Sequence, residues 1–512
     1  MNIVLTRPLV VLSTLMLGSG FATPPTSCSE MASLALPNTT ITLAVAVPAG
    51  SFKPEKPFPQ GMAATPEYDR LPAFCRVAAT VRPTTDSEIR FEVWLPLERW
   101  NGKFLAVGNG LWSGEIWYPL MAQALARGYA TANTDTGHQG DPLDASFALG
   151  HPEKLVDFGY RAVHEMTVQS KAIVAAYYGT AARYAYWNGC SSGGKQGLKE
   201  VQRYPLDYDG VIAGAPAHDW THLMASGIWT ALATRADSAS FIPPPKLGLI
   251  NAAVLRACDA LDGVTDGVLE DPRQCRFDPA ALACTGADAS ECLTTAQVAA
   301  LRKIYEGPKN PRTREQIFPG LERGSEARLV FLASFPGPIG VYDAHFKFVV
   351  FADSQWSYKR LDFDADVARA NRMDNNTINA TDPDLRPFVR RGGKLLLYHG
   401  WNDAIIAPGS TIKYYDQVRR TLGPAQTDKS VRLFMAPGMA HCDGGEGPSE
   451  FDALAALEGW VEHGIGPEKI TASQSKEGRV VRTRPLCVYP RRAKYVGAGS
   501  TDEAKNFRCV AP

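Results

Sequence analysis

Short apolar or alternating runs recur along the chain, with patterns typical of β-strands. Seven such runs predict strands: 89–96, 103–107, 129–133, 184–187, 210–213, 394–398 and 431–435. Helical patterns lie between several of them. In 161–178, for example, apolar residues recur at the three- and four-residue spacing of a helix face. Because strands alternate with helices, the pattern predicts an α/β fold around a largely parallel sheet.

The alternation breaks between about residue 215 and residue 390. This stretch contains Pro-rich turns, several cysteines, an acidic loop and few strand-like runs, whereas the alternation resumes at Lys394. A chain of 512 residues also exceeds the size at which one hydrophobic core stops growing. We therefore expect one α/β unit formed by 23–214 and 391–512, with 215–390 inserted as a lid over the ligand-binding edge of the sheet. The tail from about Arg482 is expected to pack back on the body.

Composition narrows the class of protein. The chain has 53 Lys and Arg against 53 Asp and Glu, and 45% of its residues are hydrophobic. Disorder is excluded by this apolar content. The balanced charge provides no basic field for a nucleic acid and no polybasic patch for a membrane surface.

The N-terminus has the pattern of a secretory signal peptide. Arg7 precedes an apolar run at 8–17, and 20–22 has a small-x-small cleavage pattern. A membrane anchor would need about 20 apolar residues, and this run is shorter. We therefore predict a signal peptide at 1–22 and a secreted or periplasmic protein. Such a compartment is oxidising, and the ten cysteines lack the paired CxxC spacing of a zinc site. They therefore suggest up to five disulfides.

The sequence Gly-Cys-Ser-Ser-Gly-Gly at 189–194 follows a predicted strand and precedes a helical stretch. A G-x-S-x-G pattern in this context is typical of a nucleophile elbow, where a tight, strained turn holds the serine above the sheet. Ser192 is a competing serine, but only Ser191 has glycines at both the minus-two and the plus-two positions. We predict that Ser191 is the nucleophile of an α/β-hydrolase fold.

A serine nucleophile needs a base and an orienting acid, which in α/β hydrolases follow in the order Ser, Asp or Glu, His. His441 follows a predicted strand and a flexible loop, whereas His463 has the look of a helix C-terminal residue before a glycine cap. Asp403 lies in the loop after the preceding strand, and Asp416, deeper in the next helix, is the alternative acid. We predict that His441 is the base and Asp403 the acid, with His399 in a supporting position.

Two cysteines give an independent check on this pair. Cys190 immediately precedes Ser191, and Cys442 immediately follows His441. If the serine and the histidine come within hydrogen-bonding reach, the two cysteines are close enough for a disulfide, which requires a Cα separation of roughly 4.4–6.8 Å. We therefore expect a bridge that ties the nucleophile to the base.

The oxyanion of an acyl-transfer intermediate needs backbone donors placed in advance. The Ser192 N–H, directly after the nucleophile, is one candidate. The other is expected from the glycine-rich loop after an earlier strand, at Gly108 or Gly110. The sequence leaves open which N–H of this loop points inward.

An acidic loop in the insert has three carboxylates, Asp259, Asp262 and Asp266, within eight residues. Calcium would relieve their mutual repulsion, because it accepts six to eight carboxylate and carbonyl oxygens in flexible geometry. The loop is not an EF-hand, since Val264 occupies a position where Asp or Asn is required. From these residues alone, a solvated acidic turn is an equal alternative.

The combined motifs resemble the tannase and feruloyl esterase family, which also contains terephthalate monoester hydrolases. The resemblance is carried by the G-C-S-x-G-G elbow at 189–194, the H-G-x-x-D loop at 399–403 and the His-Cys pair at 441–442. It covers nearly the whole mature chain. One departure lies at 108–112, where relatives often have a run of glycines and this chain has Gly-Asn-Gly-Leu-Trp.

The resemblance implies a lid with a structural calcium ion and a set of disulfides. The implied calcium ligands are the carboxylates of Asp259, Asp262 and Asp266 and the carbonyls of Val264 and Val268. The implied pairings are Cys28 with Cys75, Cys190 with Cys442, Cys258 with Cys275, Cys284 with Cys292, and Cys487 with Cys509.

The expected function is that of a secreted serine carboxylesterase. By resemblance, its substrate is a small aromatic ester or a feruloylated or galloylated plant material. The favoured acyl group is a hydroxycinnamate such as ferulate, with gallate second and a terephthalate monoester third. Two functions of other classes are a secreted serine peptidase and a non-catalytic carbohydrate or phenolic-ligand binder on the same fold.

Overall fold

The computed structural model describes residues 27–55, 67–235, 237–333, 337 and 340–512. The predicted signal peptide at 1–22 lies outside these residues. The described chain forms one nine-stranded sheet in the order β1-β2-β3-β5-β4-β6-β7-β8-β9. Strands β4 to β9 pair in parallel, and β1, β2 and β3 continue the sheet in antiparallel pairing. The strand bounds are β1 Thr39–Val47, β2 Phe74–Val81, β3 Ile89–Pro96, β4 Lys103–Val107, β5 Ala130–Thr134, β6 Tyr184–Cys190, β7 Gly210–Gly214, β8 Lys394–Gly400 and β9 Val431–Ala436.

All seven predicted strands are present, and the predicted helix at 161–178 is α3 (Ala162–Tyr178). Strands β1 and β2 are not among the strands predicted from the sequence. Strand β1 lies at the sheet edge, and its sequence does alternate, with Ile41, Leu43, Val45 and Val47 separated by Thr and Ala.

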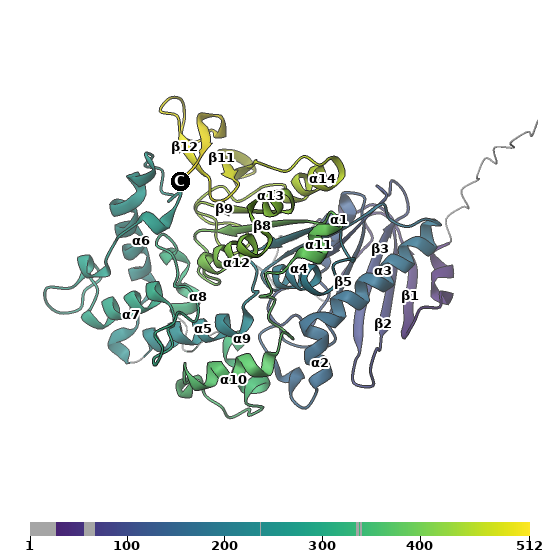
Figure 1. Ribbon diagram of the computed structural model, residues 1–512, viewed down its shortest axis with the longest axis horizontal. Helices are drawn as coiled ribbons and strands as arrows, with labels where there is room; N and C mark the ends of the chain where they lie inside the picture. The colour runs from purple at the N-terminus through teal and green to yellow at the C-terminus, as the bar shows by residue number, and fades with distance from the viewer. Residues whose placement is uncertain (1–26, 56–66, 236, 334–336, 338–339) are drawn as a thin grey trace, which may run out of the picture.

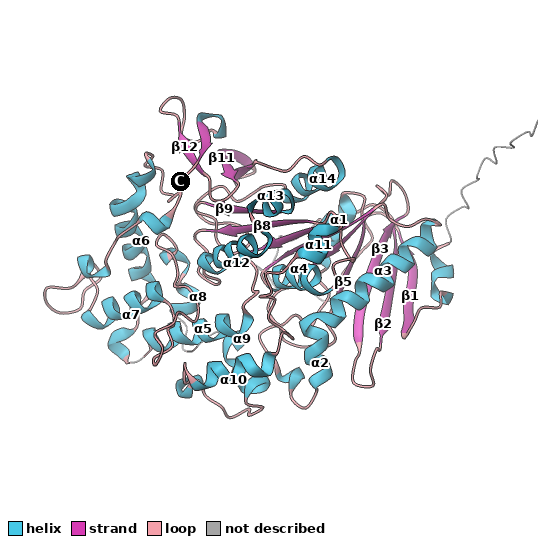
Figure 2. Ribbon diagram, viewed as in Figure 1, coloured by secondary structure: helices cyan, strands magenta, loops and turns pink. Residues whose placement is uncertain are grey.

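Helices cover both faces of the sheet (Figures 1 and 2). Helices α3, α4, α11 and α12 pack in one apolar cluster with the sheet, and α1 and α14 pack in a second. The bounds of these and the remaining helices of the α/β unit are α1 Tyr118–Ala126, α2 Pro152–Val156, α4 Ser192–Arg203, α11 Arg386–Arg390, α12 Pro408–Leu422, α13 Pro424–Ser430 and α14 Ala453–His463.

The segment between β7 and β8 is helical and has no strand among its described residues. It contributes most of a third apolar cluster, separate from the two that pack on the sheet. The division into domains at 215 and 390 stays a prediction. The helices of this insert are α5 Trp220–Thr234, α6 Pro244–Cys258, α7 Thr295–Glu306, α8 Val330–Ala333, α9 Gly340–Ala344, the π-helix η10 His345–Val350 and α10 Ala365–Asp374.

The C-terminal tail packs back on the body, as expected. It forms two small antiparallel sheets, one of β10 (Lys469–Lys476) and β11 (Arg479–Cys487), the other of β12 (Arg492–Tyr495) and β13 (Phe507–Val510). Tail residues Cys487, Ala493 and Phe507 bury apolar surface against Val264 of the acidic loop. Within the described part of the chain, no helix combines the length and the apolarity needed to cross a membrane.

Candidate active site

Ser191 occupies a tight turn between the last residue of β6 and the first residue of α4. Its backbone has φ 61° and ψ −123°, a left-handed conformation that costs a non-glycine residue about 1–3 kcal/mol. The Ser191 N–H donates to the Gly214 carbonyl of the neighbouring strand, at 3.0 Å. The turn also requires close backbone approach, because a Cβ at Gly189 would lie 2.5 Å from the backbone of Gly193. This is the strained geometry expected of a nucleophile elbow.

The structure distinguishes the two adjacent serines. The Ser192 hydroxyl donates to the Leu111 carbonyl at 2.6 Å, and the residue is only 1% exposed. Ser191 is partly exposed. Ser192 therefore ties the start of α4 to the loop after β4, and Ser191 is the serine that a substrate can reach.

The predicted acid and base are in direct contact. His441 Nδ1 lies 2.7 Å from Asp403 Oδ2. Of the two alternatives, Asp416 lies along α12, and His463 is the last residue of α14, capped by Gly464 with φ 71°. The structure thus brings His441 together with Asp403 as the sequence predicted.

The Asp403 carboxylate is fully buried and is surrounded by donors. Its Oδ1 accepts the N–H groups of Ile405 and Ile406 at 2.8 and 2.9 Å, and its Oδ2 lies 3.0 Å from His399 Nε2. Burial alone would raise the pKa of Asp403. The charge of His441 and the hydrogen bonds from His399 and His441 outweigh burial and hold that pKa well below its ordinary value. Asp403 is therefore ionised in the folded protein.

His399 is oriented by a contact with Thr411 that the sequence does not predict. Its Nε2 faces two acceptors, Asp403 Oδ2 and the Ile406 carbonyl, so this nitrogen carries the proton. Its Nδ1 then accepts from the Thr411 hydroxyl at 2.8 Å. Thr411 belongs to α12, twelve residues further along the chain, and no local motif signals its role. His399 thus supports Asp403, as expected from its position.

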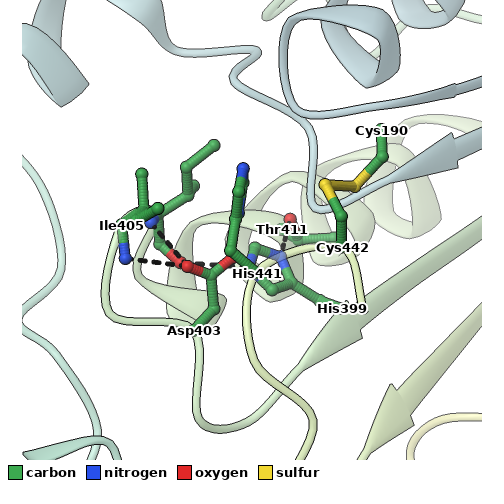
Figure 3. Close-up of a disulfide and its surroundings, with 8 residues drawn as sticks. Cys190, His399, Asp403, Ile405, Thr411, His441 and Cys442 are labelled. Carbon is green, nitrogen blue, oxygen red and sulfur yellow. Dashed lines mark hydrogen bonds and ion pairs between the residues drawn. A yellow bond between two sulfur atoms is a disulfide. The ribbon is translucent and has the colours of Figure 1, made fainter. Parts of the chain in front are cut away.

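His441 is held in the tautomer that general-base catalysis needs. Ionised Asp403 can only accept a hydrogen bond, so the proton of a neutral His441 ring is on Nδ1. The other ring nitrogen, Nε2, is then free to accept a proton. Figure 3 shows this outer nitrogen directed away from Asp403. Burial lowers the pKa of His441, but the charge and hydrogen bond of Asp403 outweigh burial and raise it above its ordinary value.

The Cys190–Cys442 disulfide joins the nucleophile turn to the histidine loop (Figure 3). The Cα atoms of the two cysteines are 5.9 Å apart, across 252 residues of sequence. The serine after Cys190 and the histidine before Cys442 are thereby held on neighbouring loops. All ten cysteines are paired, in the five pairings that the resemblance implied: Cys28–Cys75, Cys190–Cys442, Cys258–Cys275, Cys284–Cys292 and Cys487–Cys509.

The loop after β4 corrects one expectation for the oxyanion hole. The Gly108 N–H donates to the Asn188 carbonyl at 2.9 Å and is not free for a substrate oxygen. Gly108 is needed for a different reason, since a Cβ there would lie 2.5 Å from the Gly193 Cα. The Asn109 N–H is also occupied, by Gln196 Oε1 at 3.1 Å. Of the two predicted glycines, only Gly110 therefore stays a candidate donor beside Ser192.

The core of the insert anchors two loops of the active site. Trp112, just after the oxyanion loop, is fully buried and donates from Nε1 to the Val341 carbonyl of α9 at 3.2 Å. Its ring also meets Trp220 of α5 edge-on, at 4.7 Å between centroids. Ile406 and Ala407, which follow Asp403, belong to the same apolar cluster. Packing of the insert therefore positions both the loop after β4 and the loop that contains Asp403.

The acidic loop is compact and is closed by the Cys258–Cys275 disulfide. Asp259 accepts the Gly267 N–H at 2.9 Å, and Asp262 accepts the Val264 N–H at 2.9 Å. Asp266 accepts the Val268 N–H at 3.2 Å and forms an ion pair with Arg484 of the tail. The predicted ligands therefore lie in one folded loop, braced by the C-terminal tail.

Removing the Cys190–Cys442 disulfide should impair both stability and turnover. We expect the double variant C190S/C442S to unfold at a lower temperature, because closure of a loop of about 250 residues is worth up to roughly 5 kcal/mol. Turnover should fall because the serine and histidine loops lose their covalent link. Thermal unfolding and kcat measure the two effects, with C284S/C292S, which opens a short loop in the insert, as the matched control. Wild-type turnover at an unchanged melting temperature would contradict this role.

Comparison with known proteins places the chain among esterases. A family model described as tannase and feruloyl esterase matches residues 75–510. An uncharacterized esterase from Xanthomonas campestris is 42% identical, over 96% of this chain and 92% of its own length. A probable feruloyl esterase B-1 from Aspergillus fumigatus is 35% identical, over 85% of this chain and 86% of its own.

Two solved structures are also similar to this chain. Feruloyl esterase B from Aspergillus oryzae superposes with a TM-score of 0.86 at 32% identity, covering 94% of this chain and 99% of its own. A tannin acyl hydrolase from Aspergillus niger shares the fold, with a TM-score of 0.78 at 22% identity, covering 95% of each chain. The chain therefore belongs to the tannase and feruloyl esterase family, has the α/β-hydrolase fold and is a carboxylic ester hydrolase.

Proposed function

We propose that the protein is a serine esterase that hydrolyses esters of phenolic acids, with hydroxycinnamates such as ferulate as the favoured acyl group. The observation that carries the mechanism is the contact between His441 and buried Asp403, tied by the Cys190–Cys442 disulfide to the strained turn at Ser191. The substrate class is supported by the relatives that are named feruloyl esterases.

In the proposed mechanism, Ser191 Oγ attacks the ester carbonyl while His441 Nε2 takes its proton. Asp403 holds the imidazole in its tautomer and stabilises the imidazolium that forms. The N–H groups of Ser192 and Gly110 receive the oxyanion. The imidazolium then gives its proton to the leaving alcohol, and water, deprotonated by the same histidine, releases the acid from Ser191.

Gallate esters and terephthalate monoesters are the second and third candidate substrates. The family model covers tannases as well as feruloyl esterases, so the family alone does not choose among phenolic acids. Peptidase activity or ligand binding without catalysis has no comparable support, because the relatives are named esterases and the acid-base pair is intact.

We further propose that the protein is exported through the signal peptide at 1–22. The five disulfides support this proposal, because disulfides persist in oxidising compartments and are rare in the cytosol.

A structural calcium ion in the acidic loop is a separate proposal. The donor set fits calcium, since the carboxylates of Asp259, Asp262 and Asp266 and the carbonyls of Val264 and Val268 are all oxygen ligands. These three carboxylates do not converge within 4.8 Å of one another among the described residues, so the backbone carbonyls would be essential ligands. When bound, the ion would neutralise charge and stabilise the loop, and it would take no part in the ester chemistry.

Replacement of the nucleophile tests the serine mechanism. We expect Ser191→Ala to lower kcat for methyl ferulate by roughly 10⁴–10⁶-fold, because the acyl-enzyme can no longer form. Ser192→Ala is the matched control and should cost far less, since it keeps the backbone N–H. A panel of methyl ferulate, methyl gallate, a terephthalate monoester and a peptide amide measures specificity, with the highest kcat/KM expected for ferulate. Undiminished hydrolysis by Ser191→Ala would refute the mechanism.

The raised pKa of His441 predicts where activity is lost on acidification. The base must be neutral, so kcat/KM should fall as the pH drops through the His441 pKa, which the charge of Asp403 raises above the ordinary value of about 6.5. A pH profile of kcat/KM, with an ester that does not itself titrate in this range, measures this loss of activity on the acid side. An acid limb centred well below pH 6.5 would contradict the Asp403 to His441 coupling.

Calcium removal should destabilise the protein without affecting its chemistry. At calcium concentrations 100 times the dissociation constant, one bound ion stabilises a fold by about 2.7 kcal/mol. We therefore expect excess chelator to lower the unfolding temperature of the wild type and added calcium to restore it. Asp262→Asn should respond much less. An unchanged unfolding temperature in chelator would argue against the site.

A further inference from the structure

A second group of metal-ligand side chains lies far along α4 from the nucleophile. His164 of α3, Glu200 of α4 and Asp207 of the following loop place one ligand atom each within 4.8 Å of one another. Glu200 is eight residues beyond Ser192, about 12 Å along the helix. The group is therefore outside the catalytic site.

The Glu200 carboxylate receives no hydrogen bond from the described residues around it. It is 1% exposed, and among the described residues no N–H or O–H group donates to either of its oxygens. It faces the Asp207 carboxylate, which is itself an acceptor. Lys171 is nearby, but its ammonium donates to the Asp207 backbone carbonyl. Two facing carboxyl groups in a buried place either share a proton or bind a cation, since two adjacent unpaired charges there would cost several kcal/mol.

His164 completes a set of three ligands. Its Nδ1 lies 2.7 Å from Asp207 Oδ2, and its ring is stacked on Tyr204 with centroids 3.7 Å apart. Imidazole nitrogen and carboxylate oxygen both bind zinc, and a water is added when only three ligands come from the protein. The His164 side chain is 28% exposed, so an ion can enter from solvent.

We propose that His164, Glu200 and Asp207 form a binding site for a divalent transition metal ion, with Zn²⁺ as the fitting ion. Ligand atoms across a tetrahedral zinc are about 3.3 Å apart, so the pair of His164 and Asp207 must open slightly when the ion binds. The ion would join α3, the C-terminal end of α4 and the loop before β7. Its role would be to brace the helix that begins at the nucleophile.

The test is a zinc titration of the full, disulfide-intact chain. A chromophoric chelator competes for zinc, with calcium in excess so that any calcium site remains filled. We expect one zinc per chain in the wild type and at least a tenfold weaker affinity in both His164→Ala and Glu200→Gln. Glu165→Gln is the matched control on α3, because Glu165 adjoins His164 but lies outside the group, and it should bind as the wild type does.

Thermal unfolding provides a second readout that does not depend on catalysis. Zinc should raise the unfolding temperature of the wild type and of Glu165→Gln, and it should raise that of His164→Ala and Glu200→Gln much less. Zinc binding by His164→Ala equal to that of the wild type would place the ion elsewhere and overturn the proposal. Absence of zinc binding by the wild type would also overturn the proposal. If Glu200→Gln were then as stable as the wild type, a proton shared between the two carboxyl groups would explain the pair.

Discussion

The buried charge of Asp403 is the constraint around which the active site is organised. An ionised carboxylate can be held without solvent only if hydrogen-bond donors replace the water it loses. Here the donors come from two backbone N–H groups of its own loop, from His399 at the end of β8 and from His441 in the loop after β9. Satisfying the charge therefore fixes the loop, the orientation of His399 and the tautomer of His441 together.

The insert supports this arrangement through its packing. Its apolar core contains Trp112 from the loop after β4 and Ile406 from the loop that holds Asp403. Both loops leave the carboxyl ends of sheet strands, where ligands of α/β folds bind. Because tightly packed cores transmit displacement, a change in the packing of the insert would move both loops. The disulfide supplies a third link, between the nucleophile turn and the histidine loop.

Much of this architecture was predictable because its signals are local. The central strands are short buried apolar runs between turns, and the Ser191 turn is marked by its flanking glycines. The edge strand β1 has the same kind of local signal, because Ile41, Leu43, Val45 and Val47 alternate with Thr and Ala, although it is not among the predicted strands. Gly108 was misread because a glycine permits close approach to either a substrate or a backbone, and only the structure shows that its neighbour is Gly193.

By itself, the sequence determined the family, and it predicted Ser191, Asp403 and His441 as nucleophile, acid and base, with a cysteine beside Ser191 and another beside His441. These depend on turn chemistry, strand order and adjacency along the chain, which are all present in the linear pattern. Only the tertiary structure decided that Ser192 is bonded to Leu111, that Thr411 orients His399 and that His164 meets Glu200 and Asp207. Such contacts join residues on separate elements, and their positions follow from how the helices pack on the sheet.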